Sequence, residues 1–114
     1  MLLALSAPLS LAAQTPAHFR STDIHPDRSV TFSYKDSAAT KVTLALDGVA
    51  KPIPVEKDVT GVWTVTTQPL SPEIYGYHFE ADGDKRLDPA NPHVTLNLVS
   101  ASNLLTVPGD SLQL

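Results

Sequence analysis

Residues 73–92 constrain the fold more than any other part of the chain, because they join an alternating segment to a turn and two proline-containing closures. In the first half, one face carries large apolar residues and the other carries smaller or polar ones: Tyr75, Tyr77, Phe79 and Ala81 against Ile74, Gly76, His78 and Glu80. A period of two is typical of a strand with one buried face. The turn Asp82-Gly83-Asp84 follows, and Asp88-Pro89 and Asn91-Pro92 close the segment, since proline cannot donate to a sheet. We expect one long strand, a turn and an irregular loop.

Other alternating segments are separated by turn residues at intervals typical of a small sandwich. Strands are predicted near residues 22–24 and over residues 30–35, 41–46, 62–67, 73–81, 94–99 and 104–107. Pro52 and Pro54 restrict the segment around Ile53 to an edge strand or an extended connection. Residues 56–61 are predicted as a loop, and the polar residues 100–103 lie between the last two strands. The prediction is an all-β, immunoglobulin-like β-sandwich of about seven short antiparallel strands over residues 22–108.

Composition excludes several classes of function. With 114 residues the chain has room for one small domain. Its net charge is −4 and its basic residues are scattered, so we expect no nucleic-acid partner. It contains no cysteine, which excludes a disulfide, a thiolate nucleophile and a cysteine zinc site. No cofactor is expected.

The first residues suggest a cellular compartment. Residues 1–13 are apolar and uncharged, which is typical of the hydrophobic part of a signal peptide, and small residues at Ser10 and Ala12 fit cleavage after Ala12 or Ala13. Residues 14–21 read as a linker. We therefore expect a periplasmic or extracellular protein; the alternative is the tail of a cytoplasmic protein. The run is too short to span a bilayer.

The sequence offers no pattern for catalysis or metal binding. The G-x-S-x-G elbow of α/β-hydrolases is absent, so no catalytic residue is assigned. The four histidines lack the spacing that places two imidazoles on one metal. Asp82, Asp84 and Asp88 do not match a calcium loop, and turn contexts favour aspartate in any case. A structural role is favoured for all three.

Aromatic side chains are the remaining route to a binding site, because sugars stack on exposed rings. Trp63 shares a strand face with Val65, which favours the core over a sugar platform. The predicted core contains Phe32, Leu44, Trp63, Tyr77 and Phe79.

Several segments together resemble a known family: residues 61–65, 69–83 and 87–92 (G-V-W-T-V, P-L-S-P-E-I-Y-G-Y-H-F-E-A-D-G and L-D-P-A-N-P). They are similar to the early-set immunoglobulin-like domains of carbohydrate-binding module family 48, which also precede glycoside hydrolase family 13 enzymes. Residues 25–32 and 39–44 resemble the version at the N-terminus of secreted bacterial esterases of the feruloyl, acetyl-xylan and enterochelin-esterase-like kind. The resemblance covers residues 22–108 and implies an α/β-hydrolase domain after Pro108.

The resemblance also suggests binding residues. Glycogen-binding members carry a lysine at the position of His78, an aromatic residue near Asp84 or Lys85, and an asparagine that Asn103 matches. They carry a further aromatic residue in the loop that corresponds to residues 47–51, where this chain has none. The candidate carbohydrate-binding residues are therefore His78, Lys85 and Asn103.

Two functions follow from the resemblance. The first is a non-catalytic accessory domain of a secreted carbohydrate-active esterase, which positions or binds a polysaccharide; plant cell-wall polysaccharide is the candidate ligand. The alternative is a structural domain that packs on the catalytic domain without binding sugar. In both, the partner is a C-terminal α/β-hydrolase domain of the same parent chain, with residues 109–114 as the linker to it. The missing aromatic residues favour the structural role for α-glucans and leave xylan open.

Overall fold

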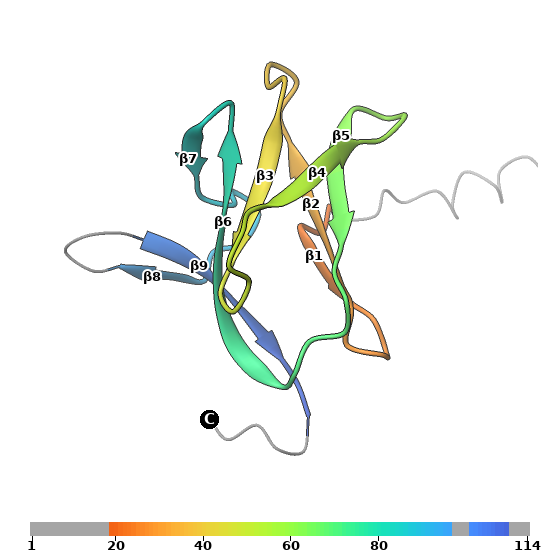
Figure 1. Cartoon of the computed structure of the whole chain (residues 1–114), viewed down its shortest axis with the longest axis vertical. Helices are drawn as coiled ribbons and strands as arrows, with labels where there is room; N and C mark the ends of the chain where they lie inside the picture. The colour runs from red at the N-terminus through yellow and green to blue at the C-terminus, as the bar shows by residue number, and fades with distance from the viewer. Residues whose placement is uncertain (1–18, 97–100, 110–114) are drawn as a thin grey trace, which may run out of the picture.

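The computed structural model describes residues 19–96 and 101–109, which form an antiparallel, all-β fold (Figure 1). These residues contain no helix. The strands are β1 (Thr22–Ile24), β2 (Val30–Lys35), β3 (Val42–Leu46), β4 (Ile53–Lys57), β5 (Val62–Thr66), β6 (Glu73–Ala81), β7 (Asp84–Arg86), β8 (Val94–Leu96) and β9 (Ala101–Val107).

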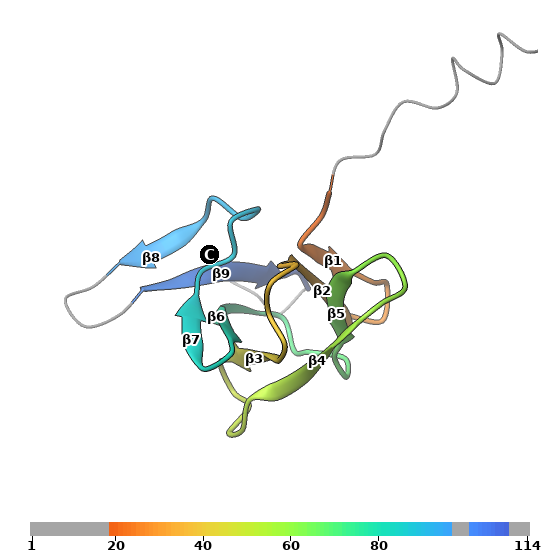
Figure 2. The same cartoon turned by 90° about the horizontal axis from the view of Figure 1, so that it is seen from above.

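The strands follow the order β1-β2-β5-β4-β3-β6-β9-β8, and β7 pairs with β6 off this path. Seen from above, the sheet curls into two facing layers, with β1, β2 and β5 in one and β3, β6, β9 and β8 in the other (Figure 2). β4 joins the layers on one side of the curl. The predicted immunoglobulin-like β-sandwich class is therefore confirmed, with nine strands in place of about seven.

The core lies between the two layers and follows the alternation of the sequence. β6 buries the four residues of its aromatic face, and β2 buries Val30, Phe32 and Tyr34. Rings from the two layers meet directly: the centroids of Phe32 and Tyr77 lie 5.0 Å apart edge-on, and those of Tyr34 and Phe79 lie 4.7 Å apart and stacked. The five residues expected in the core are all buried.

β4 differs from the expectation for residues 56–61, which are not wholly a loop. Its first half pairs with β3 through Ile53, Pro54 and Val55, and its end pairs with β5 through Glu56 and Lys57. Pro54 lies in the half of the strand that has β3 on one side only, which is the edge position where sheets tolerate proline. The strand is an edge at its start and a bridge between the layers at its end.

β9 and β7 differ from the prediction, and β8 agrees with it as far as the described residues reach. β9 begins at Ala101, so Ser102 and Asn103 lie within the last strand. β7 was not expected; it forms because Asp82 and Gly83 both have positive φ, 51° and 89°, as a tight hairpin turn requires. β8 covers 94–96 of the predicted strand, and the remainder falls in residues 97–100, outside the described residues.

The predicted signal peptide and most of the two predicted linkers fall in residues 1–18 and 110–114, which also lie outside the described residues. Within the part of the chain that is described, no helix has the length and hydrophobicity needed to cross a membrane.

Candidate functional site

The outer face of the layer formed by β3, β6 and β9 carries the first candidate, His78. The residue lies at the middle of β6, opposite Ala45 of β3, and its side chain is 21% exposed. Its Nε2 lies 3.3 Å from Glu80 Oε2, two residues further along the same strand face. The alternation that buries Tyr77 and Phe79 thus places His78 at the surface, as the sequence predicts.

Lys85 lies on the same outer face. It belongs to β7 and stands directly opposite Glu80 in the β6–β7 hairpin. Lys85 is exposed, and cross-strand neighbours of opposite charge stabilise such a pair modestly. The hairpin therefore gathers His78, Glu80 and Lys85 into one polar group on the surface.

Asn103 does not reach that surface. It is fully buried, on the core side of β9 opposite Tyr77. Its Oδ1 accepts a hydrogen bond from the backbone N–H of Asp88 at 2.7 Å, and its Nδ2 donates to the backbone oxygens of Asn91 at 3.0 Å and of Asp88 at 3.3 Å. Every polar atom of the amide is satisfied inside the fold, so Asn103 offers no atom to a ligand on the surface.

Asn103 belongs to a buried polar hub that also contains Tyr77, Asp88 and Asn91. The Tyr77 hydroxyl donates to Asp88 Oδ2 at 2.6 Å, and Asn91 Nδ2 donates to the Tyr77 oxygen at 2.9 Å and to the Leu104 carbonyl at 3.0 Å. Burial, together with the neighbouring Asp88 carboxylate, raises the pKa of the Tyr77 hydroxyl far above its usual value. These hydrogen bonds hold the D-P-A-N-P loop, residues 88–92, against β6 and β9.

Sequence reasoning missed Ser102, which faces outward on β9 next to the buried Asn103. Ser102, Ala45, Gly76 and His78 line a shallow depression of about 190 Å3 on the outer face. At its floor, Gly76 donates its backbone N–H to Asp47 Oδ2 at 2.8 Å, and a Cβ at position 76 would lie 2.9 Å from that oxygen. Extending the alternation of Leu105 and Val107 back along β9 would have identified Ser102 as the outward residue.

Trp63 lies in the core, with 6% of its surface exposed. Its indole Nε1 donates to the Asp36 carbonyl at 3.0 Å, and Lys57 Nζ lies 5.3 Å from the ring centroid on the surface side. Because so little of the ring is exposed, Trp63 presents no open platform for a sugar.

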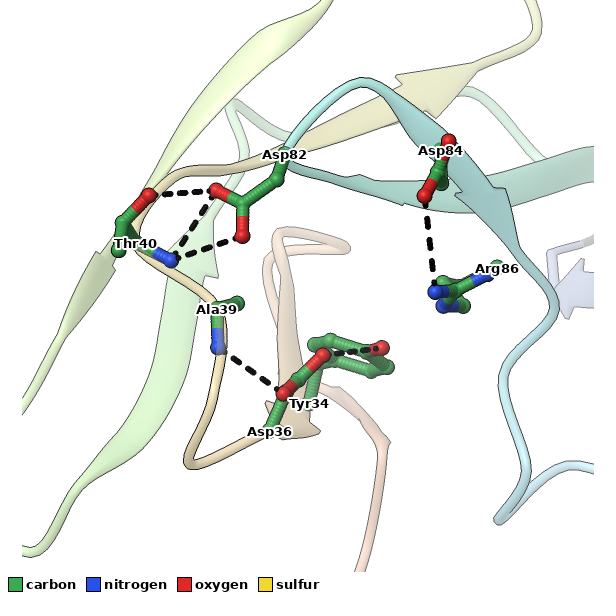
Figure 3. A network of polar contacts seen from close by, with 7 residues as sticks. All are labelled: Tyr34, Asp36, Ala39, Thr40, Asp82, Asp84 and Arg86. Atoms are coloured by element: carbon green, nitrogen blue, oxygen red, sulfur yellow. Dashed lines mark hydrogen bonds and ion pairs between the residues drawn. The ribbon is translucent and has the colours of Figure 1, made fainter.

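The aspartates of the β6–β7 hairpin and the β2–β3 loop serve separate structural roles (Figure 3). Asp82 Oδ1 accepts hydrogen bonds from the Thr40 hydroxyl at 2.6 Å and from the Lys41 N–H at 2.8 Å. Asp84 pairs with Arg86 at 3.7 Å, and Asp36 accepts the Tyr34 hydroxyl and the N–H of Ala39. Among the described residues, no group of three or more histidine, aspartate or glutamate side chains could hold a metal ion.

The Asp82 contacts predict an acid-sensitive element of stability. Hydrogen bonds from the Thr40 hydroxyl, and then from backbone N–H groups, lower the pKa of Asp82. A carboxyl whose pKa is lower in the folded state stabilises the fold above its unfolded pKa, about 3.9, and loses that contribution as pH falls through the folded value. We expect Asp82→Asn to lower the melting temperature at pH 7, and the difference from wild type to shrink toward pH 3. Asp84→Asn is the matched control, and an equal effect of both substitutions at every pH would contradict the assignment.

The sequence matches no protein-family model and no curated protein. Its fold matches solved structures. It is similar to the enterobactin esterase FES from Shigella flexneri, with a TM-score of 0.59 and 22% identity over 70% of this chain. It is also similar to a pullulanase from Paenibacillus barengoltzii, with a TM-score of 0.56 and 18% identity over 88% of this chain. A third similar structure is the glycogen-degrading pneumococcal virulence factor SpuA, with a TM-score of 0.51 and 20% identity over 78% of this chain.

The chain spans only a small part of these proteins: 30% of the esterase, 16% of the pullulanase and 11% of SpuA. At these identities the likeness establishes the shared fold. Each of the three larger proteins therefore contains a β-domain of this shape within a longer chain.

Proposed function

We propose that this chain is a non-catalytic accessory domain of a larger, secreted carbohydrate-active esterase, and that it positions or binds polysaccharide on the outer face of β3, β6 and β9. The family resemblance to carbohydrate-binding module family 48 and the similar domains in an esterase and in two glycan-degrading proteins support this proposal.

The observation that carries the proposal is the polar group of His78, Glu80 and Lys85 beside the depression at Ser102. Ala45 and Ser102 are small, and the Asp47 carboxylate beside Gly76 adds a hydrogen-bond acceptor to the depression. The neighbouring charged and imidazole groups supply donors and acceptors for sugar hydroxyls. Tyr77 is the one aromatic residue that lines this depression, and it is only 1% exposed. A ligand there is therefore held through polar contacts rather than by ring stacking.

Affinity electrophoresis of the chain in gels that contain xylan, glycogen or starch tests the proposal. We expect xylan to retard the wild type, and His78→Ala to reduce the retardation at least about fivefold, because a lost hydrogen bond to a ligand costs about 1 kcal/mol or more. His93→Ala is the matched control, since His93 is an exposed histidine of a loop outside the depression. Lys85→Ala tests the second surface residue. The absence of retardation on every polysaccharide would exclude the binding role.

The alternative is a purely structural domain that packs on the esterase domain. The complete reading frame bears on both versions: a frame that continues into a G-x-S-x-G hydrolase agrees with an accessory domain, and a frame without a catalytic domain contradicts it. Retardation by a polysaccharide then separates the binding domain from the structural one.

A further inference from the structure

A groove of about 540 Å3 lies between β1 and β9, and its exposed lining is more apolar than polar. Phe19 and Ile24 line it from the side of β1, Leu104 and Thr106 line it from β9, and Ile74 lines it from β6. Ile74 is 49% exposed although it lies in a strand. In the described part of the chain, β1 pairs only with β2, and β9 beyond Asn103 pairs only with β6. The groove thus combines apolar side chains with strand edges that lack a partner strand. At Leu104 the loop before β8 takes both backbone groups, since the N–H donates to the His93 carbonyl at 2.9 Å and the carbonyl accepts Asn91 Nδ2 at 3.0 Å.

Pro108 and Gly109, which follow β9, are held in place next to one end of this groove. Arg28 Nε donates to the Pro108 carbonyl at 3.3 Å, while the Arg28 carbonyl accepts the Leu70 N–H at 2.9 Å. Gly109 lies so close to Pro72 that an added Cβ would stand 2.7 Å from the proline Cβ, which explains the glycine.

The segments that hold the exit continue directly from the walls of the groove. Pro108 lies two residues after Thr106, Pro72 lies two residues before Ile74, and the turn that contains Arg28 follows Ile24. Gly109, the last residue that the structure describes, is therefore held close to one end of the groove.

We propose that this groove is the docking surface for an apolar segment of the domain that follows in the same polypeptide. This inference rests on the proposed role as an accessory domain. A covalent connection at the rim gives the following domain an effective concentration of about millimolar, so a weak apolar contact is enough to hold it there.

Thiol reactivity in the complete polypeptide tests the inference. Residues 1–114 contain no cysteine, so any thiol that peptide mass spectrometry locates among them is the introduced one. We compare Ile74→Cys with Val49→Cys, because these side chains are 49% and 41% exposed and Val49 lies outside the groove. The rate of maleimide modification, located by peptide mass spectrometry and divided by the rate in urea, is expected to be at least about tenfold lower at position 74 than at position 49.

Thr106→Cys provides a second reporter in the groove, in case Ile74→Cys does not fold, and is expected to show the same protection. The inference would be overturned if the cysteine at position 74 or 106 reacted as fast as the one at position 49, or if only the cysteine at position 49 reacted slowly. Either result would leave the accessory role intact. A reading frame without a following domain would overturn both, so the two failures are distinguishable.

Discussion

Asn103→Asp is expected to destabilise the domain by about 3 kcal/mol or more at pH 7, although it changes a single group of the side chain. The aspartate retains an oxygen for the Asp88 N–H but loses the N–H donors that reach the carbonyls of Asn91 and Asp88 at 3.0 and 3.3 Å. Each buried acceptor left without a donor costs about 1–3 kcal/mol, and the new oxygen adds charge to a fully buried site.

The measurement is urea unfolding followed by the fluorescence of Trp63, the only tryptophan, which is buried. Ser102→Ala is the matched control on the outward side of the same strand, with an expected cost below about 1 kcal/mol. Burial raises the pKa of an introduced carboxyl, so the destabilisation by Asn103→Asp relative to wild type should be smaller at pH 4 than at pH 7. Similar costs for both substitutions would show that the hub does not hold the closing loop.

The same hub explains why one part of the candidate site was misplaced from the sequence. Alternation located His78 correctly, because a strand with an aromatic face fixes the direction of every second side chain. Asn103 was assigned to the site through the family resemblance, whereas the alternation of Leu105 and Val107, extended back along β9, turns it inward. The sequence does not show which groups satisfy the buried amide, because Asp88 and Asn91 come from a distant loop.

Pairing with neighbouring strands also explains β7 and the end of β4, which the sequence patterns did not predict. Asp84, Lys85 and Arg86 are all exposed, so β7 has no apolar face that a pattern could detect. β4 changes its partner from β3 to β5 midway, and Glu56 and Lys57 carry no alternation. By contrast, β2, β3 and β6 alternate strictly, since each buries one face against the opposite layer. The position of Lys85 beside Glu80 therefore depended on a strand that only the structure identifies.

Phe79 connects the two layers of the fold through contacts of its ring. Phe79 is fully buried; its ring stacks on Tyr34 of the other layer at 4.7 Å and meets Tyr77 edge-on at 6.1 Å. Phe79→Ala removes both ring contacts and leaves a cavity, which costs about 3–5 kcal/mol in buried cores. Since small domains are stable by only about 5–15 kcal/mol, we expect the variant to be unfolded or nearly so at 37 °C.

Phe79→Leu should keep most of the volume and cost roughly half as much, which separates the loss of packing from the loss of the ring itself. His78→Ala, one position away on the outer face, should cost less than about 1 kcal/mol and provides the control for a change in the same strand. Urea unfolding followed by Trp63 fluorescence measures all three. If Phe79→Ala cost no more than His78→Ala, the ring contacts between β2 and β6 would not be what holds the layers together. The outer face would then lack the rigid support that the proposed binding role needs, because β6 carries both sets of residues.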